Sequence, residues 1–148
     1  MPLPVLADEA IELSATVEDW RAAVTLAGLV LVRSGAATPD YSHEMIRMIE
    51  EHGPYVVIAP GLALAHARPG PEVLADGLAI VTLAEPVNFG HPHNDPVSVV
   101  LALAIKTADS HLAAVADLAN VFNDSNAIQA LAAATSVAEV QAIMGGDS

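Results

Sequence analysis

One stretch in the middle of the chain decides the fold class: YVVIAPGLALAH, residues 55–66. It holds two short apolar runs on either side of Pro60 and Gly61, and it ends at His66. Short apolar runs between Gly and Pro turn signals are typical of strands. Two more runs of this kind follow, so the middle of the chain is predicted to form a sheet. The predicted strands are residues 55–58, 62–65, 78–84 and 97–105.

The segments outside this middle part have the apolar spacing of helices. Residues 20–33 repeat apolar side chains at helical intervals and are followed by Gly35, a common residue after a helix end. Helices before and after a set of strands in the sequence indicate an α/β fold. No linker or repeat divides residues 1–148, so one domain is expected. Residues 11–17 alternate only loosely between apolar and polar. The other predicted helices run from Thr38-Pro39-Asp40 to His52, from 110 to 122 with Asp109 as N-cap, from 124 to 134, and from a cap at Ser136.

The composition excludes several classes of site. The chain has no cysteine, which excludes disulfides, zinc–thiolate sites and a thiol nucleophile. Its formal net charge of −13 argues against binding to nucleic acid or to an anionic membrane. The N-terminus lacks the features of a signal peptide, and no apolar run approaches the ~20 residues of a bilayer span. We therefore expect a cytoplasmic protein, and no cofactor, because nucleotide-binding glycine loops are also absent.

His66 has the most informative setting of the six histidines. A strand-like run delivers it to a turn that begins with Arg68 and Pro69, which would hold its imidazole at the edge of a loop. A neutral imidazole is a nucleophile near pH 7, and a phosphorylated imidazole is a good leaving group, so His66 could accept and pass on a phosphoryl group. Arg68 or backbone N–H groups could offset the charge of the phosphoryl oxygens. The alternative is a structural histidine that only makes a hydrogen bond.

His111 is a second candidate, at the start of a predicted helix. It could meet His66 across the top of the sheet and orient its ring or donate to phosphate. The alternative is a solvated residue in the first turn of the helix.

The loop FGHPHNDP, residues 89–96, joins two predicted strands and is dense in turn formers. It could form a wall of the site, and His91 and Asn94 are its candidate binding residues. Its His91, His93 and Asp95 also have a spacing that could supply metal ligands, although the two prolines favour a turn over a flat strand.

Residues 51–67, EHGPYVVIAPGLALAHA, resemble the signature of enzyme IIA domains of the mannitol–fructose superfamily, in the bacterial phosphoenolpyruvate-dependent sugar phosphotransferase system. Ala65 departs from the signature, because the family has Pro before the histidine. Other segments look most like the ascorbate-type branch, namely Gly53-Pro54-Tyr55, Arg68-Pro69 and Asn94-Asp95-Pro96-Val97. The positions that meet the signature are Glu51, Ile58, Ala59, Leu62, Ala63, Leu64, His66 and Ala67.

This resemblance implies a mixed β-sheet flanked by helices on both faces, with His66 phosphorylated by the carrier protein HPr. The phosphoryl group would pass to a cysteine of a IIB domain and then to a sugar, such as ascorbate, at a membrane-embedded IIC permease. His111 falls where the superfamily has a second active-site histidine. Glu50 stands where mannitol-type members have an arginine, which leaves Arg68 or backbone amides to stabilise the phosphate.

Two alternatives stay open at this point. One is a regulatory protein like the nitrogen-related IIA homologues, in which phosphorylation controls binding to a target. The other is a metal-binding protein that uses His91 and His93. Exposed aliphatic side chains on Ala-rich helices also permit a homodimer.

Overall fold

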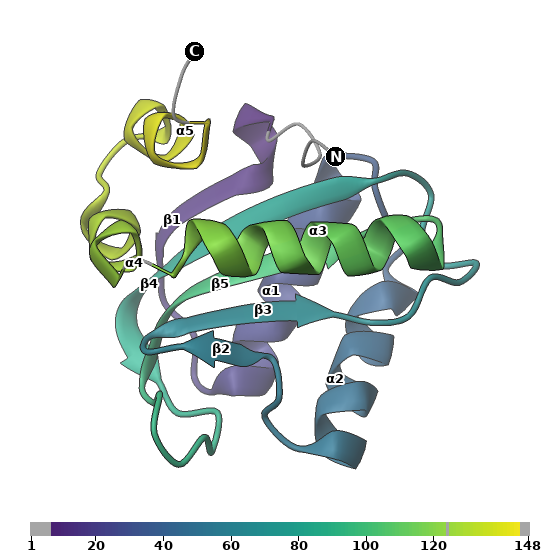
Figure 1. The fold of residues 1–148 in the computed structure, drawn as a ribbon, viewed down its shortest axis with the longest axis horizontal. Helices are drawn as coiled ribbons and strands as arrows, with labels where there is room; N and C mark the ends of the chain where they lie inside the picture. Colours follow the sequence, from purple (N-terminus) through teal and green to yellow (C-terminus); the bar gives the residue numbers. More distant parts are fainter. Residues whose placement is uncertain (1–6, 124, 146–148) are drawn as a thin grey trace.

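The computed structural model describes residues 7–123 and 125–145, and its centre is a five-stranded mixed sheet (Figure 1). The strand order is β1-β4-β5-β3-β2, so β2 and β1 are the two edges. The pairs β1–β4 and β3–β5 are parallel, whereas β4–β5 and β2–β3 are antiparallel. The strands are β1 (Ile11–Ala15), β2 (Val57–Ala59), β3 (Leu62–His66), β4 (Gly77–Val87) and β5 (Val97–Ala104).

Helices cover both faces of this sheet, which confirms the predicted fold class. In Figure 1, α1 and α2 lie behind the sheet and α3 crosses its front, with α4 and α5 beside the β1 and β4 side. A single 3-10 turn, Asp8–Ala10, precedes β1. The helices are α1 (Trp20–Arg33), α2 (Asp40–His52), α3 (Ala108–Val121), α4 (Ser125–Ala133) and α5 (Val137–Gly145).

The helix ends follow local capping chemistry. At the start of α1, the Asp19 carboxylate accepts a hydrogen bond from the Ala22 N–H at 2.9 Å. The predicted cap of α3 at Asp109 is wrong, because the helix begins earlier and Thr107 accepts from the Ser110 N–H instead. The predicted cap at Ser136 is confirmed by its bond from the Glu139 N–H at 3.2 Å.

The core consists almost entirely of aliphatic side chains from the inner strands. All residues of β3 except His66 are buried, and so is nearly all of β5, because both faces of these strands are covered by helices. β1 was not assigned from the sequence, and its irregular pattern has a structural cause. Its register against β4 shifts near Ser14, which has a positive φ of 54° and donates its N–H to the Thr82 hydroxyl.

Helix α3 is held less firmly than the strands it crosses. Only Ala114 and Leu118 of this helix are buried, and the side chain of Leu112 is 70% exposed. Small alanine side chains bury little apolar area, so they contribute little to the stability of the contact. Among the described residues, no helix is long and apolar enough to cross a membrane.

Candidate functional site

His66 is the last residue of β3, and the fold fixes its backbone firmly. It pairs with Leu103 of the parallel strand β5, and the residue before it, Ala65, is fully buried. Parallel strands end at the same edge of a sheet, so the segments that follow β3 and β5 meet beside His66. The predicted position of His66 at a strand end is thus confirmed.

A hydrogen bond at the His66 ring decides which nitrogen is free. Nδ1 lies 2.8 Å from the Leu64 carbonyl oxygen, which can only accept, so Nδ1 carries the proton and Nε2 carries the lone pair. Burial lowers the pKa of His66, and the bond to Leu64 opposes this shift in part. The half-buried ring therefore stays neutral near pH 7, with Nε2 as its nucleophilic atom.

His111 lies directly beside His66, as the sequence suggested. It comes from the first turn of α3, and the two ring centroids are 5.1 Å apart. Burial lowers the pKa of His111, and the neighbouring His66 lowers it further. Its Nδ1 is buried and has no hydrogen-bond partner among the described residues. We call His66 and His111 the histidine pair.

A pocket of about 300 Å³ opens beside the histidine pair. The Tyr55 ring stands edge-on to the His66 ring, with centroids 5.4 Å apart at 87°. Burial raises the pKa of Tyr55, and the nearby Arg68 charge opposes this effect. The lining residues are Met48, His52, Tyr55, His66, Ala67, Arg68 and His111.

Arg68 is the only arginine or lysine that lines this pocket. The other three arginines among residues 7–123 and 125–145 each form ion pairs with glutamates, whereas Arg68 forms none. Glu50 does not line the pocket, because its carboxylate turns to α1 and binds Arg21 at 3.0 Å. An anion bound at His66 would therefore meet Arg68 and not Glu50.

The structure does not bring His91 and Asn94 to His66. The Asn94 carbonyl accepts from the Gly61 N–H at 3.0 Å, which places this loop at the start of β3. From there to His66 the strand spans about 13 Å, at roughly 3.3 Å per residue. The expectation that the 89–96 loop walls the His66 site is therefore wrong.

The groups proposed as metal ligands serve the loop itself. The Asp95 carboxylate accepts three backbone N–H groups, from Phe89, Gly90 and His91. Nδ1 of His91 accepts two more, from His93 and Asn94. Within the described part of the chain, no three His, Cys, Asp or Glu side chains gather closely enough to hold a metal ion.

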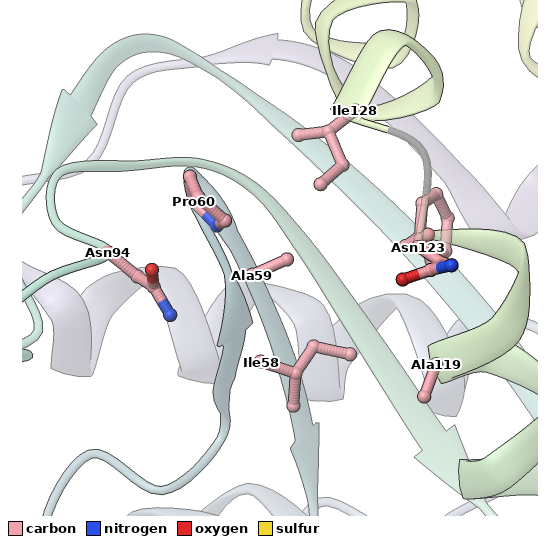
Figure 2. A pocket seen from close by; sticks show the side chains of 8 residues that line it. Ile58, Ala59, Pro60, Asn94, Ala119, Asn123 and Ile128 are labelled. Carbon is pink, nitrogen blue, oxygen red and sulfur yellow. The ribbon is translucent and has the colours of Figure 1, made fainter.

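A larger pocket, of about 450 Å³, lies away from the histidine pair. Figure 2 shows its walls, which come from the β2 turn around Pro60, the end of α3 and Ile128 of α4. Its only polar side chains are Asn94 and Asn123, and it contains no titratable or nucleophilic group. We therefore assign the chemistry to the smaller pocket at His66.

Three pocket residues, Met48, His52 and Tyr55, received no role from the sequence. For Tyr55 a signal existed, because Pro60 and Gly61 mark a tight turn. Antiparallel pairing about that turn, with Val57 opposite Ala63, brings Tyr55 back to the end of β3. No comparable signal pointed to Met48 and His52, since their place in the pocket depends on how α2 packs.

Comparison with known proteins shows the family to which the chain belongs. Residues 4–145 match the family described as "Phosphoenolpyruvate-dependent sugar phosphotransferase system, EIIA 2". The ascorbate-specific phosphotransferase EIIA component of Shigella boydii is 36% identical over 134 residues, which cover 90% of this chain and 87% of that protein.

Two solved structures share the fold. Mannitol IIA of Escherichia coli, in complex with phosphorylated mannitol IIB, matches with a TM-score of 0.85 and 27% identity, covering 97% of this chain and 99% of that chain. The nitrogen regulatory protein IIA-Ntr of Neisseria meningitidis matches with a TM-score of 0.81 and 27% identity, covering 95% and 96%. The chain is therefore a member of the EIIA type 2 family of the phosphoenolpyruvate-dependent sugar phosphotransferase system.

Proposed function

We propose that the chain carries a phosphoryl group between two proteins, with Nε2 of His66 as the atom that accepts and releases it. The observation that carries this proposal is the Nδ1–H bond to the Leu64 carbonyl, because it leaves the lone pair on Nε2. The lowered pKa of His66 supports it, since the neutral ring is the nucleophilic form.

The transfer runs in two balanced steps. In the first, the Nε2 lone pair attacks the phosphorus of phospho-HPr, and the bond from phosphorus to the donor atom breaks, with the electron pair left on HPr. In the second, a cysteine thiolate of a IIB domain attacks the same phosphorus, and the P–N bond returns its electron pair to Nε2. The proton stays on Nδ1, hydrogen-bonded to the Leu64 carbonyl, throughout both steps, so His66 needs no other base.

The pocket supplies groups that can stabilise the phosphoryl oxygens. Arg68 has no carboxylate partner and lines the pocket, so its guanidinium is available for charge-assisted hydrogen bonds. His111 belongs to the first turn of α3, where the helix dipole also favours an anion. Nδ1 of His111 has no hydrogen-bond partner among the described residues, so this ring can form a further hydrogen bond.

The comparisons support one of the partners, a IIB domain. The relative from Shigella boydii is ascorbate-specific, and the mannitol IIA neighbour is seen bound to a phosphorylated IIB domain. We therefore propose a IIB domain of an ascorbate-type system as acceptor, HPr as donor and a IIC permease as the final member. We place this exchange in the cytoplasm.

Incubation with phosphoenolpyruvate, enzyme I and HPr tests the proposal. The chain should gain one acid-labile, base-stable phosphate, which mass spectrometry should map to His66. The label should be absent in His66→Ala and intact in the matched control His91→Ala, because His91 lies at the far end of β3. Label that survives His66→Ala and disappears in His91→Ala would refute the assignment.

The role of His111 is tested in the second step, the transfer of the phosphoryl group from His66 to a IIB domain. His111→Ala should still be labelled, but it should donate to a IIB domain about tenfold more slowly, because one donor to the phosphoryl oxygens is lost. Transfer at the wild-type rate would remove His111 from the site.

A regulatory role is the second candidate, and the fold shared with IIA-Ntr is the observation in its favour. The higher identity to the ascorbate-specific relative favours transport. Rapid phosphoryl transfer to a purified ascorbate-type IIB domain would support transport. A failure of that transfer, with normal labelling by HPr, would favour regulation.

A further inference from the structure

Tyr41 is a buried residue of α2 whose hydroxyl reaches the end of β3. The hydroxyl donates to the Leu103 carbonyl at 2.6 Å and accepts from the Ala67 N–H at 3.1 Å. Burial raises the pKa of Tyr41 to about 12, so the hydroxyl keeps its proton and can make both bonds at once. Its two partners flank His66: Ala67 follows it in the chain, and Leu103 is its partner in β5.

The phase of the β3–β5 ladder explains why the hydroxyl lies there. At the start of the ladder the Val99 N–H donates to the Gly61 carbonyl at 3.1 Å. Hydrogen bonds of a parallel ladder recur every second residue. Continuing this alternation from the pair Leu62–Val99 to the pair His66–Leu103 sets the Ala67 N–H opposite the Leu103 carbonyl. The Tyr41 hydroxyl bonds both groups and thus bridges the last rung.

We propose that Tyr41 is a positioning residue for His66, because its hydroxyl holds the two strands at a fixed separation at the point where the imidazole leaves the sheet. This inference rests on the proposed function of His66 as phosphoryl acceptor. The bond from Nδ1 to the Leu64 carbonyl fixes the ring relative to its own strand. The hydroxyl bridge fixes that strand end relative to β5 and to α2, and together the two contacts aim Nε2 at the pocket.

Removing the hydroxyl leaves two outcomes, and in both the strand end that carries His66 is no longer tied to β5 through the hydroxyl. Ala67 is buried, so its N–H and the Leu103 carbonyl either stay unsatisfied or pair directly. Direct pairing would draw the strand ends together by the space of one oxygen atom. Displacements of about 1 Å at a reacting group can cost about 100-fold in rate.

The test compares Tyr41→Phe with Ile80→Val, a core variant in β4. Ile80 is fully buried and pairs with Leu101, so its truncation lowers stability without touching the last rung. Phosphoryl acceptance from phospho-HPr should slow about 10- to 100-fold in Tyr41→Phe and stay unchanged in Ile80→Val, under conditions in which both are folded.

A readout beyond activity separates positioning from loss of stability. The pH titration of the His66 imidazole, followed by NMR, should shift in Tyr41→Phe and not in Ile80→Val. An unchanged acceptance rate together with an unchanged His66 titration in Tyr41→Phe would overturn the proposal. If the wild type accepts no phosphate at all, the proposed function fails, while the titration still tests the role of Tyr41.

The wild-type protein provides a second test in case Tyr41→Phe does not fold. The Ala67 amide should exchange with solvent as slowly as amides inside β3, because it is buried and bonded to the hydroxyl. Exchange as fast as that of an open loop amide would overturn the proposal.

Discussion

The electrostatic coupling of the histidine pair gives a direct prediction about titration. The perturbation is His66→Gln, which keeps a polar side chain of similar size beside His111 and removes its charge. We expect the pKa of His111 to rise in this variant, because the repulsion by a protonated His66 is lost. Burial still lowers the pKa of His111, so the rise should be partial.

The separation of the rings sets the size of this coupling. At 5.1 Å, two unit charges repel by about 3 kcal/mol at an effective dielectric constant of 20, and by about 0.8 kcal/mol at that of water. The half-buried pair lies between these limits. The doubly protonated state is therefore disfavoured by a factor of about 4 to 250. The second proton therefore binds to the pair at a lower pH than the first.

NMR titration of the His111 ring signals measures this coupling. His91→Gln is the matched control, because it removes a histidine at the other end of β3. The midpoint for His111 should move up in His66→Gln and stay in place in His91→Gln. An identical midpoint in wild type and His66→Gln would refute the coupling.

Three further predictions concern stability. The pKa of both members of the histidine pair is lowered on folding, so the unfolded chain binds protons first as pH falls below about 6.5. The free energy of unfolding therefore falls with pH, by at most about 1.4 kcal/mol per pH unit and histidine. Urea unfolding at several pH values should show a weaker dependence of this free energy on pH when both histidines are changed to Asn, and an equal dependence would contradict the shifts. Gly28→Ala should destabilise by about 1–3 kcal/mol, because a Cβ there meets the Ser42 hydroxyl of α2, and a melting temperature equal to wild type would show that the helices can separate without cost. Asp95→Ala should destabilise by about 1–3 kcal/mol through the loss of three hydrogen bonds, two of them partly buried, and it should leave labelling by phospho-HPr intact. Lost labelling in a folded variant would place that loop in the site after all.

The sequence predicted those parts of the fold whose signals are local. The helix over residues 20–33 matches α1 at both ends, because Asp19 caps its start and Gly35 adopts a positive φ of 87° after it. The apolar runs identified β3, β4 and β5, since a strand buried on both faces needs apolar residues at every position. The edge strand β1 has neither signal and pairs with residues about 70 positions away, so it was missed.

The sequence also placed some residues of the candidate site correctly and others wrongly. His66 and His111 were found because each stands at an end of an element that the sequence could locate. His91 and Asn94 were put at the wrong end, because a loop can be assigned to one edge of a sheet only when the direction of each strand is known. The parallel pairing of β3 with β5 settles this, and it depends on contacts between residues far apart in the chain.

Because α3 buries few of its side chains, the surroundings of the two histidines should differ in how freely they vary during evolution. At the end of β3, a change in side-chain volume is transmitted through buried neighbours on both faces, so few substitutions around His66 are acceptable. Around His111 the helix buries only Ala114 and Leu118 fully, so a small shift of its axis can accommodate a different side chain. The sequences of homologous chains should therefore diverge faster along α3 than along β3. Substitutions that adapt the chain to new protein partners should occur mainly in this helix.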